Sequence, residues 1–335
     1  MKIVTIKDVA KAAKVSISTV SRVLNDRQDV DPETRARVLE MVKKLNYLRN
    51  RSASSLKQQN TAAIGVILRG RQNAFLTDLA EQVLDAGRET GFQFIMEIID
   101  EKANQFITAR HLYLEQKLQG VIFLGSSLAS QEEEVRRLDL PQVHATVQAG
   151  HLHYPHISSV SVDNRQAGRT AIEKLIELGH RDVALLGYFA GENDSTGLRL
   201  HGARDALAAA GIAHDDDLYA ECGFTLSSGY EGVRQILGRG KRFTALFAAS
   251  DMMAIGAIKA LADAGLNVPG NVSVIGFDGI EIGRYLTPAL STMRQPTQRI
   301  AEESVRLMRR LIQGQPAGHL LVECEYLPGG SVRAR

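Results

Sequence analysis

The spacing of hydrophobic positions divides this chain into three stretches. Over the first 46 residues, apolar side chains recur every three or four positions, as on one face of an α-helix. From about residue 61 onward, short β-rich apolar runs alternate with segments of helical spacing, which is typical of parallel sheets covered by helices. The pattern therefore predicts an all-α domain at 1–46, a polar linker at 47–60 and an α/β core at 61–335.

The first stretch predicts three short helices. Thr5 can cap the first helix and Ser16 the second, while the third follows "VDPET", with Asp31 as its cap and Pro32 in its first turn. Two short helices joined by a tight turn and completed by a third form a helix-turn-helix.

The predicted second helix presents short hydrogen-bonding side chains and one guanidinium: Ser16, Ser18, Thr19, Ser21, Arg22 and Asn25. An arginine can fork to guanine in the major groove, while Ser and Thr reach phosphates. Charge agrees, because residues 1–60 carry a net +7 and the rest of the chain carries −5. A basic head on an acidic body indicates that the head meets a polyanion, here double-stranded DNA.

In the core the spacing predicts two successive α/β lobes that face a cleft. Strands are expected at 62–68, 92–98, 120–125, 142–147 and 159–163, then at 182–187, 245–250, 272–278 and 290–295. Helices are expected between most of them, near 76–90, 103–117, 166–178, 198–210, 227–238, 252–264 and 297–313.

Ligands of such sheets bind beyond the carboxyl ends of the strands. The residues at those ends are Arg69, Arg71, Asp163, Ser250, Asp251, Asp278 and Gln295, and adjacent loops add Arg199 and Phe224. Asp163 can equally cap the helix that follows it, and Asp251 is expected to be a helix cap rather than a ligand contact. Arg69 and Arg71 could bind an anionic group such as a phosphate, or could be rim charges.

Two quoted stretches, "TIKDVAKAAKVSISTVSRVLN" and "VDPETRARVLEMVKKLNY", resemble the headpiece of the LacI/GalR repressors, and the likeness continues through "NRSASSLKQQNTAAIGVIL" into the core. The resemblance implies that residues 47–60 become a hinge helix on DNA and that Leu56 wedges into the minor groove. It also implies a periplasmic-binding-protein-like core in which the chain crosses between lobes near 160–165, 288–295 and 318–325. Arg49 replaces a proline common in relatives, and Gly279 stands where many relatives have a second acid.

The predicted site residues come from the residue pattern and from the family resemblance. The expected DNA contacts are Thr5, Ser16, Ile17, Ser18, Thr19, Ser21, Arg22 and Asn25 in the headpiece and, by resemblance, Asn50, Ala53 and Leu56 in the hinge. The expected effector contacts are Phe75, Asp163, Arg199, Phe224, Ser250, Asp278 and Gln295, with Arg69 and Arg71 left open; Phe75 rests on the resemblance alone.

Other function classes find little support in the sequence. There is no G-x-G-x-x-G after a strand, no Walker loop, no G-x-S-x-G elbow and no H-E-x-x-H, so we expect no enzyme and no cofactor or metal. The two cysteines, Cys222 and Cys324, are expected to be reduced thiols. Without a signal-peptide core or a bilayer-spanning run, the chain is expected in the cytoplasm rather than as a secreted sugar receptor.

The resulting prediction is a homodimeric repressor of carbohydrate-utilisation genes that binds operator DNA and is released by a sugar or sugar phosphate. A regulator that needs a non-sugar corepressor is the alternative, because the sequence does not fix the sign of the coupling between effector and DNA.

Overall fold

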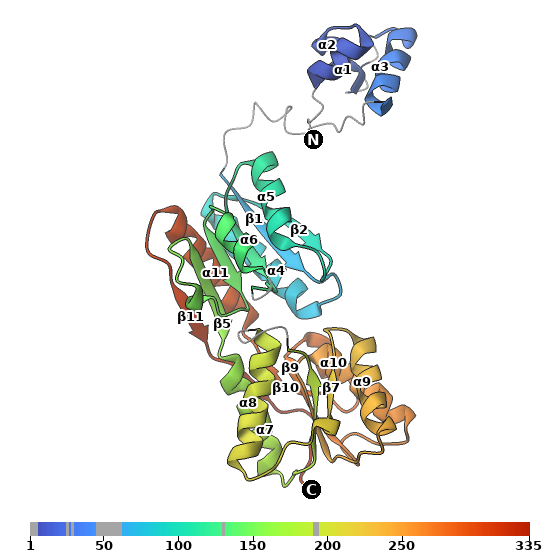
Figure 1. Cartoon of the computed structure of the whole chain (residues 1–335), viewed down its shortest axis with the longest axis vertical. Coiled ribbons are helices and arrows are strands. Elements are labelled where there is room, and N and C mark those ends of the chain that lie inside the picture. Colours follow the sequence, from blue (N-terminus) through green and yellow to red (C-terminus); the bar gives the residue numbers. More distant parts are fainter. Residues whose placement is uncertain (1–5, 25–26, 28–29, 45–61, 129–130, 190–193) are drawn as a thin grey trace. The chain divides into compact units, whose positions relative to one another are not determined.

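The computed structural model describes, of the 335-residue chain, residues 6–24, 27, 30–44, 62–128, 131–189 and 194–335. The chain separates into two compact units, Met1–Asn60 and Thr61–Arg335 (Figure 1). The first is helical and the second contains both sheets, as the hydrophobic spacing predicted.

The described residues of the first unit form three helices: α1 (Ile6–Ala13), α2 (Ile17–Leu24) and α3 (Pro32–Lys44). The turn between α1 and α2 passes through Lys14, whose φ of 54° lies in the left-handed region. The cap predicted for α3 is present, because Thr34 N donates to Asp31 Oδ1 at 2.9 Å. A small core holds the helices together and contains Val9, Ala10, Ala13, Val20, Val23 and Val38. The predicted helix-turn-helix arrangement is confirmed.

Two six-stranded sheets form the second unit. The first sheet has the order β11-β5-β4-β3-β1-β2, and all its neighbouring strands are parallel. Its strands are β1 (Ala63–Arg69), β2 (Gln93–Ile99), β3 (Leu118–Leu124), β4 (Gln142–Ala145), β5 (Ile157–Val162) and β11 (His319–Val322). The associated helices are α4 (Ala74–Gly87), η2 (Arg88–Thr90), α5 (Gln105–Gln116), α6 (Glu132–Arg137), η3 (Gly150–Leu152) and α11 (Thr297–Ile312).

The second sheet has the order β12-β10-β9-β8-β6-β7 and is parallel except for the pair β10–β12. Its strands are β6 (Val183–Gly187), β7 (Tyr219–Glu221), β8 (Ala245–Ala248), β9 (Ser273–Asp278), β10 (Ser291–Arg294) and β12 (Glu325–Leu327). The associated helices are α7 (Asn164–Glu177), α8 (Ser195–Ala209), η4 (Asp216–Leu218), α9 (Leu226–Gly238), α10 (Asp251–Asp263) and η5 (Glu281–Tyr285).

Each sheet is covered on both faces, which explains the unbroken apolar runs of its strands. In β1, Ile64 and Val66 face the core under α4 and α11, while Ile67 faces the core under α5. In β6, Leu185 and Leu186 likewise point to opposite cores. The α/β class predicted from the sequence is confirmed.

Three segments connect the two lobes. The chain passes from β5 to α7 at residue 163, from β10 to α11 at residues 295–296, and from β11 to β12 at residues 323–324. The strand β10 belongs to the second sheet, so the second crossing follows this strand. Strands β7, β11 and β12 and helix α6 were not predicted.

Glycines bring the helix pairs of the second lobe unusually close. A Cβ on Gly202 of α8 would lie 1.8 Å from the carbonyl oxygen of Arg165 in α7, and one on Gly168 would lie 2.0 Å from that of Arg199. Helices α9 and α10 approach each other in the same way, because a Cβ on Gly229 or Gly256 would likewise meet a carbonyl oxygen of the partner helix. The glycines let backbone approach backbone, so the position of α8 depends on them.

Candidate functional site

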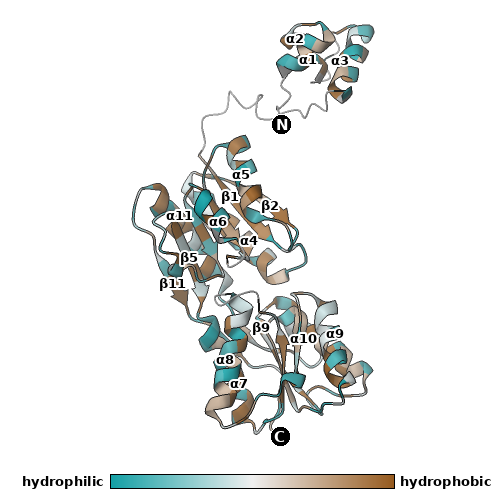
Figure 2. Ribbon diagram, viewed as in Figure 1, coloured by the Kyte–Doolittle hydropathy of each residue, from teal (hydrophilic) through white to brown (hydrophobic). Residues whose placement is uncertain are grey.

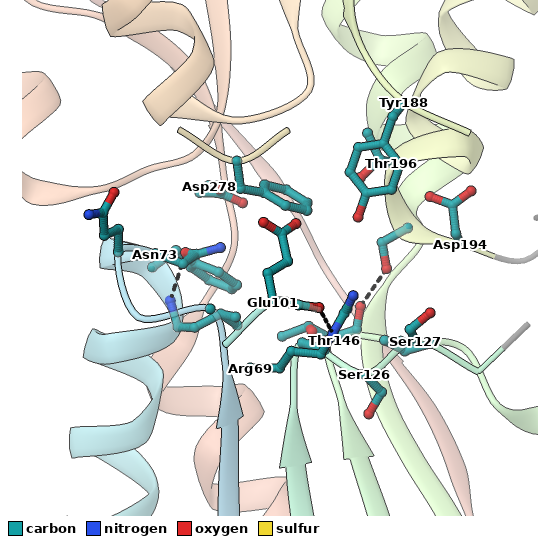
Figure 3. A pocket seen from close by; sticks show the side chains of 18 of the residues that line it. Arg69, Asn73, Glu101, Ser126, Ser127, Thr146, Tyr188, Asp194, Thr196 and Asp278 are labelled. Atoms are coloured by element: carbon teal, nitrogen blue, oxygen red, sulfur yellow. Dashed lines mark hydrogen bonds between the residues drawn. The ribbon is translucent and has the colours of Figure 1, made fainter. Parts of the chain in front are cut away.

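A cavity of about 760 Å³ lies between the two lobes, at the carboxyl ends of their strands (Figure 3). This is the place where parallel α/β sheets bind ligands. Its lining includes the predicted Phe75, Arg199, Phe224, Asp278, Arg69 and Arg71, together with Asn73, Asp100, Glu101, Lys102, Ser126, Ser127, Thr146, His151, Tyr188, Asp194, Ser195 and Thr196.

Three predicted effector residues do not line the cavity. Asp163 caps α7 by accepting from Gln166 N at 2.9 Å, and Ser250 caps α10 by accepting from Met253 N at 3.3 Å. Both follow a strand and precede a helix, so their side chains satisfy the helix start. Gln295 lies behind the lining and donates from Nε2 to Asp278 Oδ1 at 2.8 Å.

Asp278 and Arg199 form the polar centre of the second-lobe wall. They are only 4% and 3% exposed, and Arg199 Nη1 lies 3.6 Å from Asp278 Oδ1. Arg199 also donates to Asn164 Oδ1 at 2.8 Å and to the Ala249 carbonyl at 2.7 Å. Its guanidinium stacks on the Phe277 ring at 3.6 Å. These partners fix the guanidinium in one orientation beside the carboxylate.

The backbone at Asp278 is held in an uncommon conformation by Asp251. Asp278 has a φ of 119°, which favours glycine, and Gly279 follows at 80°. The fully buried Asp251 accepts hydrogen bonds from Gly279 N at 2.7 Å and Ile280 N at 2.9 Å. A Cβ on Gly279 would meet Arg294 at 2.6 Å, so the missing second acid leaves room for this bend. Asp251, predicted mainly as a cap, therefore positions Asp278.

Asp278 should make the unfolding free energy depend on pH between about 4 and 6. Burial raises the pKa of its carboxyl from 3.8 to about 6, although Arg199 and Gln295 act in the opposite direction. A carboxyl with a raised folded-state pKa contributes most stability below its unfolded pKa, and loses that contribution as pH rises through its folded pKa. We expect the stability of the wild-type chain relative to Asp278→Asn to fall by about 3 kcal/mol between pH 4 and 7. Urea unfolding at several pH values measures this difference, and a rise with pH would contradict the assignment.

Arg69 binds the ends of the first-lobe strands to one another. Its Nε donates to the carbonyl of Glu101 at 2.7 Å and its Nη1 to that of Gly125 at 3.3 Å. Arg71 is exposed at the rim. Two of the five N–H groups of Arg69 are thus already used on backbone carbonyls.

Several lining residues were missed by the sequence analysis. Glu101 lies two residues after β2 and Tyr188 directly follows β6, so the same strand-end rule could have found both. The Tyr188 ring meets Phe224 edge-on, with ring centroids 5.6 Å apart. Across the cleft, Ser195 Oγ at the start of α8 donates to the carbonyl of Thr146 in the first lobe at 2.7 Å.

The first unit presents the predicted DNA-contacting helix α2. Ser16 caps it by accepting from Thr19 N at 3.1 Å, and Ser16, Ile17, Ser18 and Arg22 are exposed. Thr19 and Ser21 are half-buried. The predicted contacts Thr5, Asn25, Asn50, Ala53 and Leu56 lie outside the described residues.

The described part of the chain bears on three features: a metal site, a membrane span and a disulfide. There, no group of three or more His, Cys, Asp or Glu side chains is arranged to hold a metal ion. None of the helices described has both the length and the apolar character of a bilayer span. Cys222 and Cys324 are free thiols.

Comparison with known proteins relates both units to one class. A family model for "Bacterial regulatory proteins, lacI family" matches residues 5–50, and one for a "Periplasmic binding protein-like domain" matches residues 172–332. The transcriptional regulator MalR of Clostridium butyricum is 37% identical over 332 residues, which cover 96% of this chain and 97% of that protein. Catabolite control protein A of Priestia megaterium is 31% identical over 323 residues, covering 96% and 97%.

Solved structures agree over the whole length. A complex of the transcriptional regulator CelR with cellobiose has a TM-score of 0.74 at 29% identity and covers 98% of this chain and 99% of that one. The lac repressor dimer bound to operator and the anti-inducer ONPF has a TM-score of 0.71 at 27% identity, covering 99% and 100%.

Proposed function

This chain belongs to the lacI family of bacterial regulatory proteins and is a DNA-binding transcriptional regulator, not an enzyme, and from that premise we propose how its two units divide the work. The headpiece reads the half-sites of a palindromic operator as a homodimer, and the cavity takes a sugar or sugar phosphate. Filling the cavity releases a repressor of carbohydrate-utilisation genes, and the protein acts in the cytoplasm, where the chromosome is.

The effector proposal rests on the buried pair of charged side chains in the cavity wall. The Asp278 carboxylate and the Arg199 guanidinium, both buried, offer one acceptor and one donor group side by side. Aromatic rings from both lobes, Phe75, Tyr188 and Phe224, line the same cavity. Paired hydroxyls suit the charged groups, and aromatic rings cover the apolar faces of sugar rings.

The mechanism is a shift between two lobe orientations. A ligand that contacts Asp278 in one lobe and Phe75 in the other favours one orientation over the other. In a dimer this shift changes the separation of the two segments that lead to the headpieces. Operator and effector must then weaken each other by the same factor.

A gel shift with the DNA upstream of the protein's own gene tests the proposed function. The chain is expected to bind this DNA specifically and to release it when one of a panel of sugars is added. Tighter binding in the presence of a ligand would reverse the sign and support a corepressor. No specific binding with or without ligands would contradict the proposal.

Arg22→Ala should remove most of the operator specificity. Arg22 is exposed on α2, and a fork from Arg to guanine contributes about 1–3 kcal/mol of base discrimination. We expect the affinity for the operator to fall by about 10- to 100-fold. Fluorescence anisotropy should show a much smaller loss on random DNA, where phosphate contacts dominate. Equal losses on both DNAs would make Arg22 a phosphate contact instead.

Exposed apolar side chains support the homodimer. They are Met96 and Ile98 on β2, Ile107, Tyr113 and Leu114 on α5, and Ile282 and Tyr285 on η5; Figure 2 shows hydrophobic residues on β2 and α5. Apolar groups gathered on a surface mark interfaces in general. We assign these residues to the dimer interface.

Tyr285→Asp should shift the chain toward monomer. Tyr285 is 76% exposed, so the substitution leaves the fold of the isolated chain intact, while a charge inside an apolar interface is costly. Sedimentation velocity at micromolar concentration should show the monomer, and operator affinity should fall in parallel. Leu321→Asp is the control, because β11 lies at the opposite edge of the first sheet from β2. A Tyr285→Asp dimer as tight as the wild type would remove η5 from the interface.

A further inference from the structure

Glu101 is an acidic residue of the cavity whose carboxylate has no partner among the residues that the structure describes. It lies just after β2 and is half-buried, and its carboxylate makes no hydrogen bond or ion pair with any residue that the structure describes. Its backbone carbonyl, by contrast, is held by Arg69 Nε at 2.7 Å. The main chain is therefore fixed while the carboxylate stays available to a ligand.

The Glu101 side chain points into the cavity from the first lobe toward the second. Figure 3 shows its carboxylate between the Arg69 side of the cavity and the Asp278 side. The carboxylate also acts electrostatically on the second lobe, because burial, Asp194 and Glu101 together raise the pKa of the Tyr188 hydroxyl. A ligand between the lobes would thus meet carboxylates from both of them.

Each arginine and lysine of the lining either holds other protein groups or lies at the rim. Arg199 is engaged with Asn164, Ala249 and Asp278. Arg69 is directed at two carbonyls, and Arg71 and Lys102 are exposed at the rim. A phosphate group at the centre of the cavity would therefore lie beside the Glu101 carboxylate, and like charges repel when they are partly shielded from water.

We propose that Glu101 is a specificity-determining residue that accepts hydrogen bonds from hydroxyl groups of an uncharged saccharide and rejects its phosphorylated counterpart. The proposal rests on the proposed function, since it narrows the effector of the same cavity from sugar or sugar phosphate to neutral sugar. It assigns the positive charge of Arg69 to holding the loop rather than to binding an anion.

Isothermal titration calorimetry of the full-length chain with matched pairs tests this inference. The probes are glucose, maltose and cellobiose, each beside its 6-phosphate or 6′-phosphate. We expect at least one neutral sugar to bind at least about tenfold more tightly than its phosphate, because the phosphate must approach Glu101. Glu101→Gln keeps the size but removes the charge, so it should weaken the neutral sugar a few-fold and reduce the preference to about threefold or less. Glu101→Lys should reverse the preference.

The control is Glu89→Gln, an exposed residue of η2 outside the cavity, which should retain the wild-type ratio. Operator binding by each variant without sugar reports that it has folded. Tighter binding of a phosphate by the wild type, or an unchanged ratio in Glu101→Gln, would overturn the inference. Binding of no neutral saccharide would overturn it together with the sugar effector, while specific operator binding would still support the regulator.

Discussion

Gly202→Ala is expected to destabilise the second lobe by about 3 kcal/mol or more, toward the upper end of the usual cost of overpacking. The added methyl group would lie 1.8 Å from the carbonyl oxygen of Arg165 and 2.8 Å from the amide nitrogen of Arg169. Both are backbone atoms of α7, so no side-chain rotation can relieve the clash and the helices must separate. The gain of about 1 kcal/mol in helix propensity from replacing glycine is too small to compensate.

The same substitution should also weaken effector binding. Helix α8 carries Arg199 less than one turn before Gly202, and Arg199 must stay beside Asp278. Urea unfolding and sugar titration measure the two effects. Gly238→Ala is the matched control, because nothing lies within 4 Å of a Cβ at the end of α9, and it should be neutral or stabilising by up to about 1 kcal/mol. Equal stability of the two variants would show that α7 and α8 can move apart freely.

Arg199→Met should cost about 3–5 kcal/mol of unfolding free energy at neutral pH, as expected when one partner of a buried ion pair is removed. Methionine retains much of the volume but none of the donors. The side-chain oxygen of Asn164 and the carbonyl of Ala249 would lose their partner. Asp278 would have to ionise alone or take up a proton. The variant should also fail to bind the effector, while its headpiece still binds random DNA.

Arg165→Met tests whether this loss comes from burial. Arg165 pairs with Asp205 at 2.7 Å, but the two side chains are 59% and 38% exposed. Exposed pairs contribute about 0–1 kcal/mol, so this control should unfold close to the wild type. If the unfolding free energies of Arg199→Met and Arg165→Met differed by less than about 1 kcal/mol, the buried pair would contribute no more to stability than the exposed one.

The sequence predicted the parts of the fold that depend on periodic burial. Helix-turn-helix spacing identified α1 to α3, and the long apolar runs identified the central strands of both sheets. Strands β7, β11 and β12 escaped because they have only three or four residues and partly exposed positions, so they carry little apolar pattern. Helix α6, six residues from Glu132 to Arg137, is highly charged and equally weak as a signal.

The candidate site was harder to predict because strand ends have two uses. A polar residue after a strand can face the ligand, as Asp278 faces the cavity, or cap the next helix, as Asp163 and Ser250 do. Composition does not separate these uses, since the direction of the side chain depends on the turn. At Asp278 that direction requires a positive φ and the remote carboxylate of Asp251, neither of which is visible in the local sequence.

The hydrogen bond between Ser195 and Thr146 joins the lobes at the first residue of α8, and Arg199 lies four residues further along the same helix. A rise of 1.5 Å per residue places the two only about 6 Å apart along the helix axis. Helix α8 thus carries, about one turn apart, the proposed effector contact Arg199 and the hydrogen bond that joins the lobes. An effector that displaced Arg199 would therefore act on the joint between the lobes through a single turn of helix.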